Sequence, residues 1–301
     1  MSFTSDPEVD KAYAPSRSLP EGVFQANMDL YRDRSLDVYR TLPHERDVIY
    51  DAASGQGLDI VPAPGPGLKP AFVFIHGGYW RMLSKNESVY MAPALNARGI
   101  ALVAPDYSLA PATSLEEIVR QVRAAIAWLY RHGAEHGIDP ERLYVGGHSA
   151  GGHLTGAVVA GGWREGMGLP ENVIKGAMPV SGLFDLEPIT RSFVNEWMAL
   201  DRARADALSP IHHLPPQPCK MVVAWGGDET SGFHDQSHAW LAAWREAGFS
   251  AVALMVPGRH HFDIVLDWCD PDSAMTRALA AMVFPQNVAD REEPESSRLR
   301  P

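Results

Sequence analysis

Short apolar runs alternate with longer amphipathic segments along most of this chain. The apolar runs have the length of strands and cover residues 71–75, 100–104, 142–146, 174–180, 220–225 and 251–256. The segments between them have the length of helices and cover residues 86–98, 114–132, 152–161, 233–247 and 272–283. Strands without polar alternation are typical of a parallel sheet that is covered on both faces. The pattern predicts one doubly wound α/β domain with a mostly parallel central sheet.

Segment 114–132 carries the clearest helical signal. Its apolar side chains recur at spacings of three and four, at Leu115, Ile118, Val119, Val122, Ile126 and Leu129. Side chains at that spacing line one face of a helix, so we expect this helix to pack against the sheet.

The polar N-terminal residues 1–45 precede the regular pattern. Within them, residues 28–39 predict an amphipathic helix, whose expected anchors are Leu30, Tyr31, Leu36 and Tyr39. We interpret residues 1–45 as an arm packed on the main domain.

The main domain is expected to span residues 46–285. It begins with two edge strands, 46–50 and 57–61, which pair in an antiparallel manner across a turn at 52–55. The alternation lapses at 183–216, and we interpret this segment as a small cap insertion that walls the active site. The charged tail 286–301 is expected to be disordered.

The sequence Gly147-His148-Ser149-Ala150-Gly151 follows an apolar run and leads into another apolar segment. This is the Gly-X-Ser-X-Gly pattern in a strand–turn–helix context, where the sharp turn exposes a nucleophile. Ser149 is therefore the candidate nucleophile.

A serine nucleophile needs a base and an orienting acid, which follow it in the order Ser, Asp, His in this kind of fold. Asp228 stands at the end of one strand and is the candidate acid, with Glu229 as a weaker substitute. His260 and His261 stand at the end of the next strand, and the residues alone leave the choice between them open.

His76-Gly77-Gly78 ends the first central strand, in the position of a loop that binds the oxyanion of acyl transfer. We assign the donors to the amides of Gly77, Gly78 and Ala150. His76 is expected to hold the loop by hydrogen bonds.

Composition narrows the function classes. Hydrophobic residues make up 46% and charged residues 21% of the chain, as in ordinary globular proteins. The formal net charge of −11 disfavours nucleic acid and anionic membranes as partners. No apolar run approaches the length of a membrane span and no secretory signal is visible, so we expect a cytoplasmic protein. The two cysteines, Cys219 and Cys269, are expected to be buried small hydrophobes.

No cofactor or metal is expected. Two histidine pairs have the i, i+4 spacing of metal ligands, but neither has an evident third ligand, and we interpret both as solvated helix faces. They are His132 with His136 and His234 with His238.

The motifs together resemble the α/β-hydrolase superfamily, and within it the hormone-sensitive-lipase-like branch and the kynurenine formamidases, or arylformamidases. The branch shows in the 76–78 and 147–152 motifs. The narrower likeness rests on Tyr79-Trp80, on residues 227–237 and on His261-Phe262-Asp263. The resemblance implies a catalytic triad of Ser149, Asp228 and His261 and an oxyanion hole in the 76–80 loop.

This resemblance implies a serine hydrolase that cleaves a small amide or ester, with deformylation of an N-formyl aromatic amide as the leading hypothesis. Bulky Tyr79 and Trp80 narrow the acyl side if they face the site, although both rings could equally pack into the core. The candidate substrate-binding residues are Tyr79, Trp80, His148, Phe184 and Trp197.

The alternatives are a general carboxylesterase acting on short-chain esters and a non-catalytic hydrolase-like ligand receptor. A receptor would be expected to lack part of the triad. The sequence leaves open whether the chain forms a homodimer.

Overall fold

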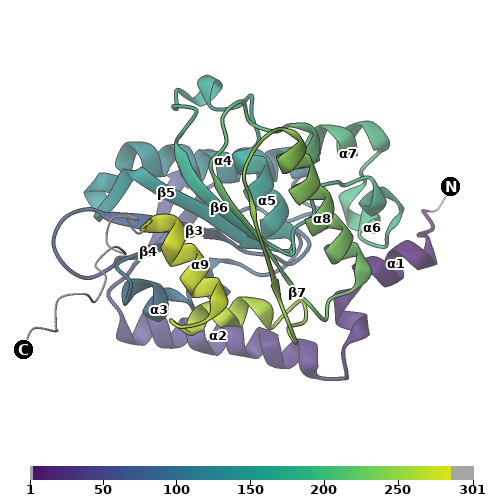
Figure 1. Ribbon diagram of the computed structural model, residues 1–301, viewed down its shortest axis with the longest axis horizontal. Coiled ribbons are helices and arrows are strands. Elements are labelled where there is room, and N and C mark those ends of the chain that lie inside the picture. Colours follow the sequence, from purple (N-terminus) through teal and green to yellow (C-terminus); the bar gives the residue numbers. More distant parts are fainter. Residues whose placement is uncertain (1–2, 286–301) are drawn as a thin grey trace, which may run out of the picture.

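The computed structural model describes residues 3–285, and its centre is an eight-stranded sheet (Figure 1). The strands lie in the order β1-β2-β4-β3-β5-β6-β7-β8. Only β2 runs antiparallel to its neighbours, and the pairs from β4 to β8 are parallel. The predicted mostly parallel sheet is therefore confirmed. The strand bounds are β1 Glu45–Asp51, β2 Gln56–Val61, β3 Lys69–Ile75, β4 Ala101–Pro105, β5 Ile138–His148, β6 Ile174–Val180, β7 Lys220–Gly226 and β8 Val252–Val256.

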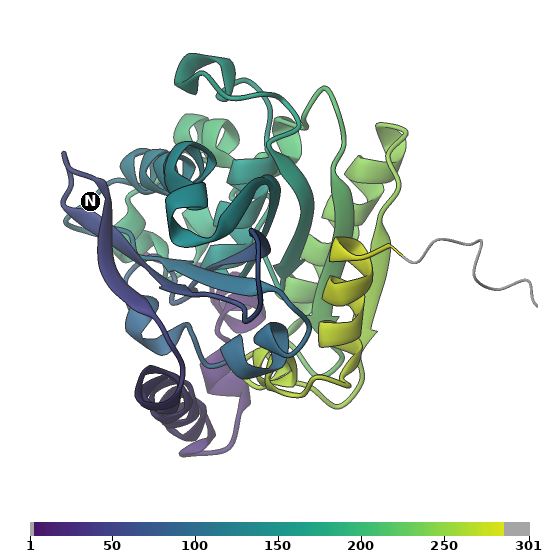
Figure 2. The ribbon, with the colours of Figure 1, turned by 90° about the vertical axis from the view of Figure 1, so that its left-hand side faces the viewer.

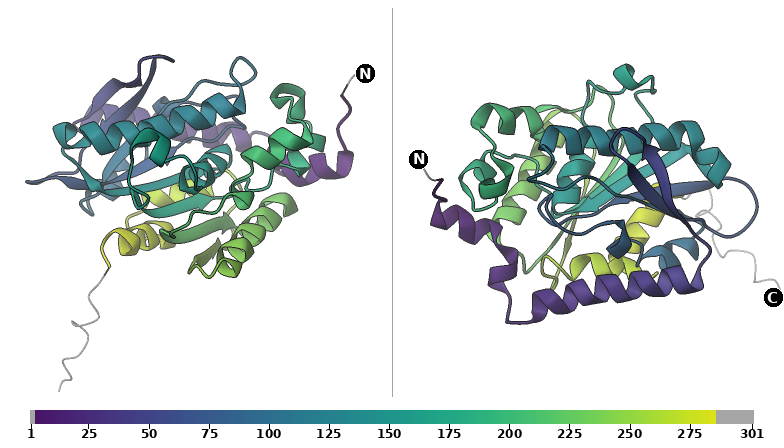
Figure 3. Two further views of the ribbon diagram at one scale, coloured as in Figure 1. Left: turned by 90° about the horizontal axis from the view of Figure 1, so that it is seen from above. Right: turned by 180° about the vertical axis from the view of Figure 1, so that it is seen from behind.

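Helices cover both faces of this sheet, as Figures 2 and 3 show. One core cluster contains buried side chains of α4, α5 and α8, and the other contains those of α2, α3 and α9. The doubly wound arrangement follows, because each face of the sheet is apolar and each is buried by its own helices. The helix bounds are α1 Pro7–Tyr13, α2 Val23–Thr41, α3 Ala92–Asn96, α4 Leu115–His132, α5 Ala150–Val159, α6 Asn195–Met198, α7 Arg202–Leu208, α8 Ser231–Glu246 and α9 Ala274–Val283.

Helix α4 forms where the apolar spacing predicts it. The Ser114 side chain accepts a hydrogen bond from the amide of Glu117 and so caps the first turn. Every apolar position of the predicted stripe is buried. By contrast, the only α-helix within the predicted helix 86–98 is the five-residue α3, and a 3₁₀ turn at Lys85–Glu87 precedes it. Pro93 lies in its first turn, where the amide that a proline lacks would have no acceptor within the helix.

The rotation of α2 differs from the expectation. Tyr31 is buried as predicted, but Leu30 and Leu36 are 40% and 45% exposed, so their assignment as anchors is wrong. The Tyr31 ring stacks on Tyr90 at 5.2 Å, and its hydroxyl donates to the carbonyl of Phe262. These contacts fix which side of the helix faces the domain.

The buried side of α2 also carries polar groups. Tyr39 is half-buried, and its hydroxyl donates to Asp59 Oδ2 at 2.6 Å. Ser35 is buried, and its small side chain lies between Tyr31 and Val38 on the same side of the helix. A stripe that mixes small polar and aromatic residues gives a weak apolar signal, which explains the wrong assignment of the leucines.

Segment 183–216 follows β6 and folds into two short α-helices, α6 and α7, flanked by 3₁₀ turns at Pro188–Arg191 and Pro210–His212. It lies beside α1 and α8 in Figure 1. The prediction for the tail, 286–301, lies outside the described residues.

Within residues 3–285, no helix is both long enough and apolar enough to span a bilayer. Cys219 and Cys269 are both unpaired and half-buried. Burial raises the pKa of the Cys219 thiol to about 12.

Candidate active site

The turn between β5 and α5 is the predicted nucleophile elbow. Ser149 occupies it with φ 57° and ψ −116°, a region that residues with a side chain rarely adopt. Its amide donates to the carbonyl of Val180 at 2.9 Å, which ties the turn to β6. A Cβ on Gly151 would lie 2.0 Å from the carbonyl oxygen of Ile75, so the close crossing of β3 and α5 requires glycine there.

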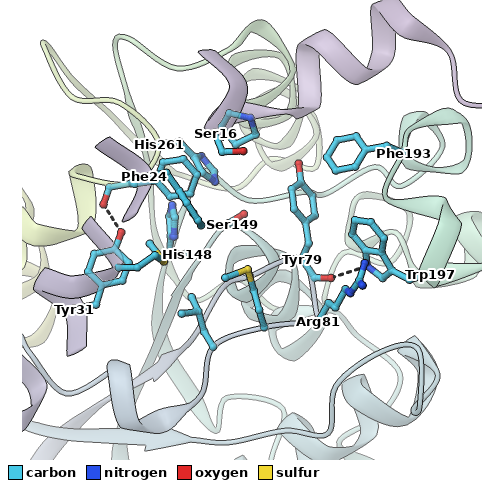
Figure 4. Close-up of a pocket in the computed structure, with 16 residues that line it drawn as sticks. Ser16, Phe24, Tyr31, Tyr79, Arg81, His148, Ser149, Phe193, Trp197 and His261 are labelled. Atoms are coloured by element: carbon cyan, nitrogen blue, oxygen red, sulfur yellow. Dashed lines mark hydrogen bonds between the residues drawn. The ribbon is translucent and has the colours of Figure 1, made fainter. Parts of the chain in front are cut away.

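His261 lies at the same cavity as Ser149, in the loop after β8 (Figure 4). Its Nδ1 atom is 2.8 Å from Oε2 of Glu229, and the two side chains are 3% and 0% exposed. An ionised carboxylate only accepts hydrogen bonds, so Nδ1 carries the proton and Nε2 is left with a lone pair. An imidazole in this tautomer can act as a base.

The acid beside this histidine is Glu229, which corrects the assignment of Asp228. Asp228 is exposed, and its amide donates to the carbonyl of Arg259 at 2.9 Å. Its carboxylate forms no hydrogen bond or ion pair with any residue in the range 3–285. The turn after β7 thus directs the side chain at 228 outward and the side chain at 229 inward.

Three hydrogen bonds hold the Glu229 carboxylate in place. Oε1 accepts from the amide of Gly226 at 2.6 Å and from the hydroxyl of Ser181 at 2.5 Å, while Oε2 accepts from His261. The longer side chain of glutamate lets the carboxylate fold back under the end of β7, where an aspartate at the same position would be one methylene too short.

The structure also separates the two neighbouring histidines. His260 is half-buried, and its Nδ1 accepts from the amides of Phe262 and Asp263 at 3.1 and 3.2 Å. Its own amide donates to Asp263 Oδ1 at 2.8 Å. His260 therefore shapes the turn, and His261 is the histidine that lines the cavity with Ser149.

The loop after β3 lies directly against the elbow. A Cβ on Gly77 would be 3.3 Å from the Cβ of Ser149 and 2.7 Å from the carbonyl oxygen of His148. The amides of Gly77, Gly78 and Ala150 donate no backbone hydrogen bond to any acceptor in the described chain, apart from the sheet and helix ladders. Gly78 lines the cavity, whereas Gly77 and Ala150 are not among its lining residues.

His76 supports this loop, as predicted. Its Nδ1 is 3.0 Å from the carbonyl oxygen of Gly77, and its ring stacks on Tyr107 at 4.0 Å. The Tyr107 hydroxyl lies within hydrogen-bond distance of the carbonyl oxygens of both His76 and Gly77, at 3.0 and 3.2 Å. These contacts fix the loop's backbone carbonyls, and they leave its amides free to point elsewhere.

A cavity of about 340 Å³ opens above Ser149. Its walls come from the N-terminal arm, the loop after β3, the cap insertion and the loop after β8. Six aromatic rings line it: Phe24, Tyr31, Tyr79, Phe193, Trp197 and Phe262. The sequence predicted the contribution of the cap insertion, but the contribution of the arm was missed, since Pro15, Ser16, Phe24, Met28 and Tyr31 all belong to it.

Two candidate substrate-binding residues do not reach the cavity. Trp80 is fully buried, and its Nε1 donates to Nδ1 of His153 at 3.3 Å. Phe184 is also fully buried and stacks on Trp240 at 4.7 Å. Both assignments are corrected, because these rings pack in the core behind the site.

The other three candidates, Tyr79, His148 and Trp197, do line the cavity. Trp197 Nε1 donates to the carbonyl of Tyr79 at 3.2 Å, which joins the cap insertion to the loop after β3. The Tyr79 hydroxyl donates to the carbonyl of Tyr13, which joins that loop to the arm. The pocket is thus assembled from segments that are far apart in the sequence.

His148 contributes a neutral imidazole to the cavity wall. Burial, and then the neighbouring His261 ring at 4.5 Å, hold the pKa of His148 well below its usual range. Its Nε2 atom is buried and has no hydrogen-bond partner in the described residues.

Among residues 3–285, no three His, Cys, Asp or Glu side chains cluster at metal-binding distances. The ring of His136 packs on Trp128, and its Nδ1 lies 2.8 Å from Glu45. His132 packs on the same tryptophan and pairs with Glu135.

Comparison with known proteins places these features in a family. A family profile described as the α/β-hydrolase fold matches residues 72–210. Kynurenine formamidase of Danio rerio is 32% identical over 292 residues, which cover 93% of this chain and 97% of the relative. Esterase LipQ of Mycobacterium tuberculosis is 27% identical, over 74% of this chain and 59% of that esterase.

Among solved structures, a crystal structure from Silicibacter sp. TM1040, provisionally described as a thioesterase, superposes with a TM-score of 0.78. It is 29% identical and covers 90% of this chain and 98% of its own. The likeness therefore extends beyond the matched profile to nearly the whole fold.

Proposed function

The chain belongs to the α/β-hydrolase family of enzymes, and on that premise we propose that it is a serine hydrolase that removes a formyl group from an aromatic amide. One observation carries this proposal. Ser149 of the elbow and His261 of the loop after β8 open onto a cavity of about 340 Å³ that is lined by six aromatic rings. A cavity of this size is at the small end for ligand sites and suits one aromatic ring with a short acyl group.

The first half of the reaction needs a base beside the nucleophile. His261 Nε2 takes the hydroxyl proton as Ser149 Oγ attacks the formyl carbon. Glu229 holds the imidazole in the required tautomer and stabilises the imidazolium that forms. The negative charge develops on the former carbonyl oxygen, and the amides of Gly78 and Ala150, with that of Gly77, supply its donors.

Collapse of the tetrahedral intermediate breaks the C–N bond. His261 gives its proton to the departing amine nitrogen, which leaves as a neutral arylamine. A formyl ester on Ser149 remains, and a water molecule activated by His261 hydrolyses it to formate. The serine hydroxyl is regenerated, so neither a metal nor an external cofactor enters any of these steps.

Tyr79 supports a preference for a small acyl group. The ring lines the cavity next to Gly78, and its hydroxyl is held by the Tyr13 carbonyl of the arm. A side chain fixed at both its backbone and its tip cannot swing aside for a long acyl chain without breaking that hydrogen bond. The relative from Danio rerio, a kynurenine formamidase, agrees with this preference.

Steady-state kinetics test the proposal. We expect formanilide and N-formylkynurenine to be deformylated, with release of stoichiometric formate, and long-chain aryl esters to be poor substrates. A preference for long acyl chains with no deformylation would overturn it.

A short-chain carboxylesterase is the second candidate, because the same triad cleaves esters and one relative is an esterase. Rapid hydrolysis of 4-nitrophenyl acetate without formate release from any formamide would favour this alternative.

A further inference from the structure

Arg81 is the one charged side chain in the otherwise apolar and neutral lining of the cavity. No other lysine or arginine and no aspartate or glutamate is among the lining residues. Within the described part of the chain, the Arg81 guanidinium forms no ion pair and no side-chain hydrogen bond. A guanidinium at the edge of an aromatic pocket is an anion-binding group, since it presents five donors in a planar fork.

The position of Arg81 is fixed by the site itself. Its amide donates to the carbonyl of Gly78 at 3.0 Å, so the residue is part of the turn that forms the oxyanion loop. Its guanidinium carbon lies 4.7 Å from the ring centre of Trp197. Trp197 in turn donates to the carbonyl of Tyr79, and Figure 4 shows the two side chains together at one side of the cavity. Arg81 is exposed, and the contact with the Trp197 ring restrains its cation beside the cavity.

The charge of the whole molecule disfavours an anionic substrate unless a local cation binds it. The formal net charge is −11, so an approaching carboxylate is repelled at long range. An arginine in the cavity lining offsets that repulsion where the substrate binds, and a carboxylate can accept two parallel hydrogen bonds from it.

We propose that Arg81 binds a carboxylate on the substrate, so that the enzyme selects N-formyl aromatic amides that carry an acid group over neutral ones. This inference rests on the proposed deformylase function and assigns a further specificity-determining residue of the same site. Arg81 is a binding residue in this proposal, and it takes no part in the proton transfers.

The experiment compares the desamino analogue of N-formylkynurenine, a formamide that carries a carboxylate and no amino group, with its neutral methyl ester, and uses formanilide as the smallest neutral substrate. The measured quantity is the ratio of kcat/KM for the acid to that for the methyl ester. The wild-type protein should prefer the acid. Arg81→Gln should lower the ratio about tenfold, mainly through KM, because a charge-assisted hydrogen bond is lost. Arg81→Lys should retain part of the preference, because the charge remains but the planar fork does not.

A matched control is available outside the cavity. The guanidinium of Arg17 stacks on the Phe193 ring at 5.1 Å, and Arg17 does not line the cavity. Arg17→Gln changes the net charge by the same amount but removes no lining residue, so the ratio of kcat/KM values should stay as in the wild-type protein. Raising the ionic strength should lower the wild-type ratio and hardly change that of Arg81→Gln, since salt screens an exposed charge pair.

The outcomes are distinguishable. Formanilide hydrolysis together with a wild-type ratio near one, or an unchanged ratio in Arg81→Gln, overturns the role of Arg81 and leaves the deformylase proposal standing. A fall of the same size in Arg17→Gln also overturns it, because the effect would then be one of net charge. Absence of any formamide hydrolysis by the wild-type protein overturns both proposals.

Discussion

Replacing Glu229 with glutamine exchanges one carboxylate oxygen for an NH2 group and leaves the shape nearly unchanged. The carboxylate accepts from the amide of Gly226 on Oε1 and from Nδ1 of His261 on Oε2. Glutamine has a single oxygen, so it cannot accept from both. The Gly226 amide can only donate, whereas an imidazole can move its proton to the other nitrogen.

The glutamine oxygen should therefore remain with Gly226, and its NH2 group should face His261. That arrangement favours the tautomer with the proton on Nε2, which cannot accept the proton of Ser149. The equivalent carboxylate-to-amide change in a Ser-His-Asp triad lowers kcat about 10,000-fold, which corresponds to about 5.4 kcal/mol of transition-state stabilisation. We expect a loss of the same order for Glu229→Gln.

Asp228→Asn is the matched control, because it makes the same chemical change at the adjacent, exposed residue. We expect its kcat to stay within about twofold of the wild-type value, as for most surface substitutions. The assay is formanilide or 4-nitrophenyl acetate hydrolysis under saturating substrate, with circular dichroism and thermal unfolding to confirm that each variant is folded.

The reasoning would be refuted if Asp228→Asn lost most of the activity while Glu229→Gln kept it. That result would mean that the acid acts from residue 228, as the sequence alone suggested. Similar small losses in both variants would show that neither carboxylate orients the histidine.

Three further changes test other parts of the site. Gly78→Ala should lower kcat/KM about 100-fold or more, because the φ angle of Gly78 is 95° and the new Cβ would lie 2.3 Å from the Met82 carbonyl oxygen. Activity within twofold of the wild-type value would contradict the assignment of this loop to the oxyanion hole. Phe24→Ala should raise KM for formanilide and lower kcat/KM roughly tenfold, because the Phe24 ring lines the cavity and packs edge-on against Phe262 at 4.9 Å. An unchanged KM would show that the N-terminal arm does not bind substrate. Burial lowers the pKa of His153 from 6.5 to about 4. Between these two pH values the imidazole is protonated in the unfolded chain and neutral in the folded chain, so stability is lost as the pH falls. Between pH 7 and pH 4, the free energy of unfolding of the wild-type protein should therefore fall about 3 kcal/mol further than that of His153→Gln, as measured by denaturant titration. An equal pH dependence in the two proteins would contradict the neutral, buried state of His153.

Most of the sheet could be predicted from the sequence because its signals are local. The apolar strands and the Gly-X-Ser-X-Gly turn depend on neighbouring residues, and the structure has β3 to β8 close to the predicted bounds. The elbow is a steric requirement, since a Cβ at Gly151 would collide with the adjacent strand, and such requirements are visible as glycine in the sequence.

Local sequence signals could not show which acidic residue pairs with His261. Asp228 and Glu229 are adjacent acidic residues in one turn, and the choice depends on which side chain the turn directs toward Ser181 and His261. That direction is a property of the tertiary structure, because the partners of the inward carboxylate come from the ends of β6 and β7 and from the loop after β8.

The residues that line the cavity could not be predicted from the sequence for a similar reason. Trp80 and Trp197 are both aromatic residues near glycine-rich or loop segments, yet one packs in the core and the other lines the cavity. The contribution of the arm arises from contacts across more than two hundred positions, such as the bond between Tyr31 and Phe262. A polar stripe with scattered aromatics carries no local sign of such contacts.

The central claim is that Ser149 is the nucleophile, and covalent labelling by a fluorophosphonate tests it most directly. Intact mass spectrometry of the wild-type protein should show one adduct per chain, and peptide mapping should locate it on Ser149. The Ser149→Ala variant, folded by circular dichroism, should show none. An adduct on another residue, equal labelling of Ser149→Ala, or no labelling of the wild-type protein would contradict the account.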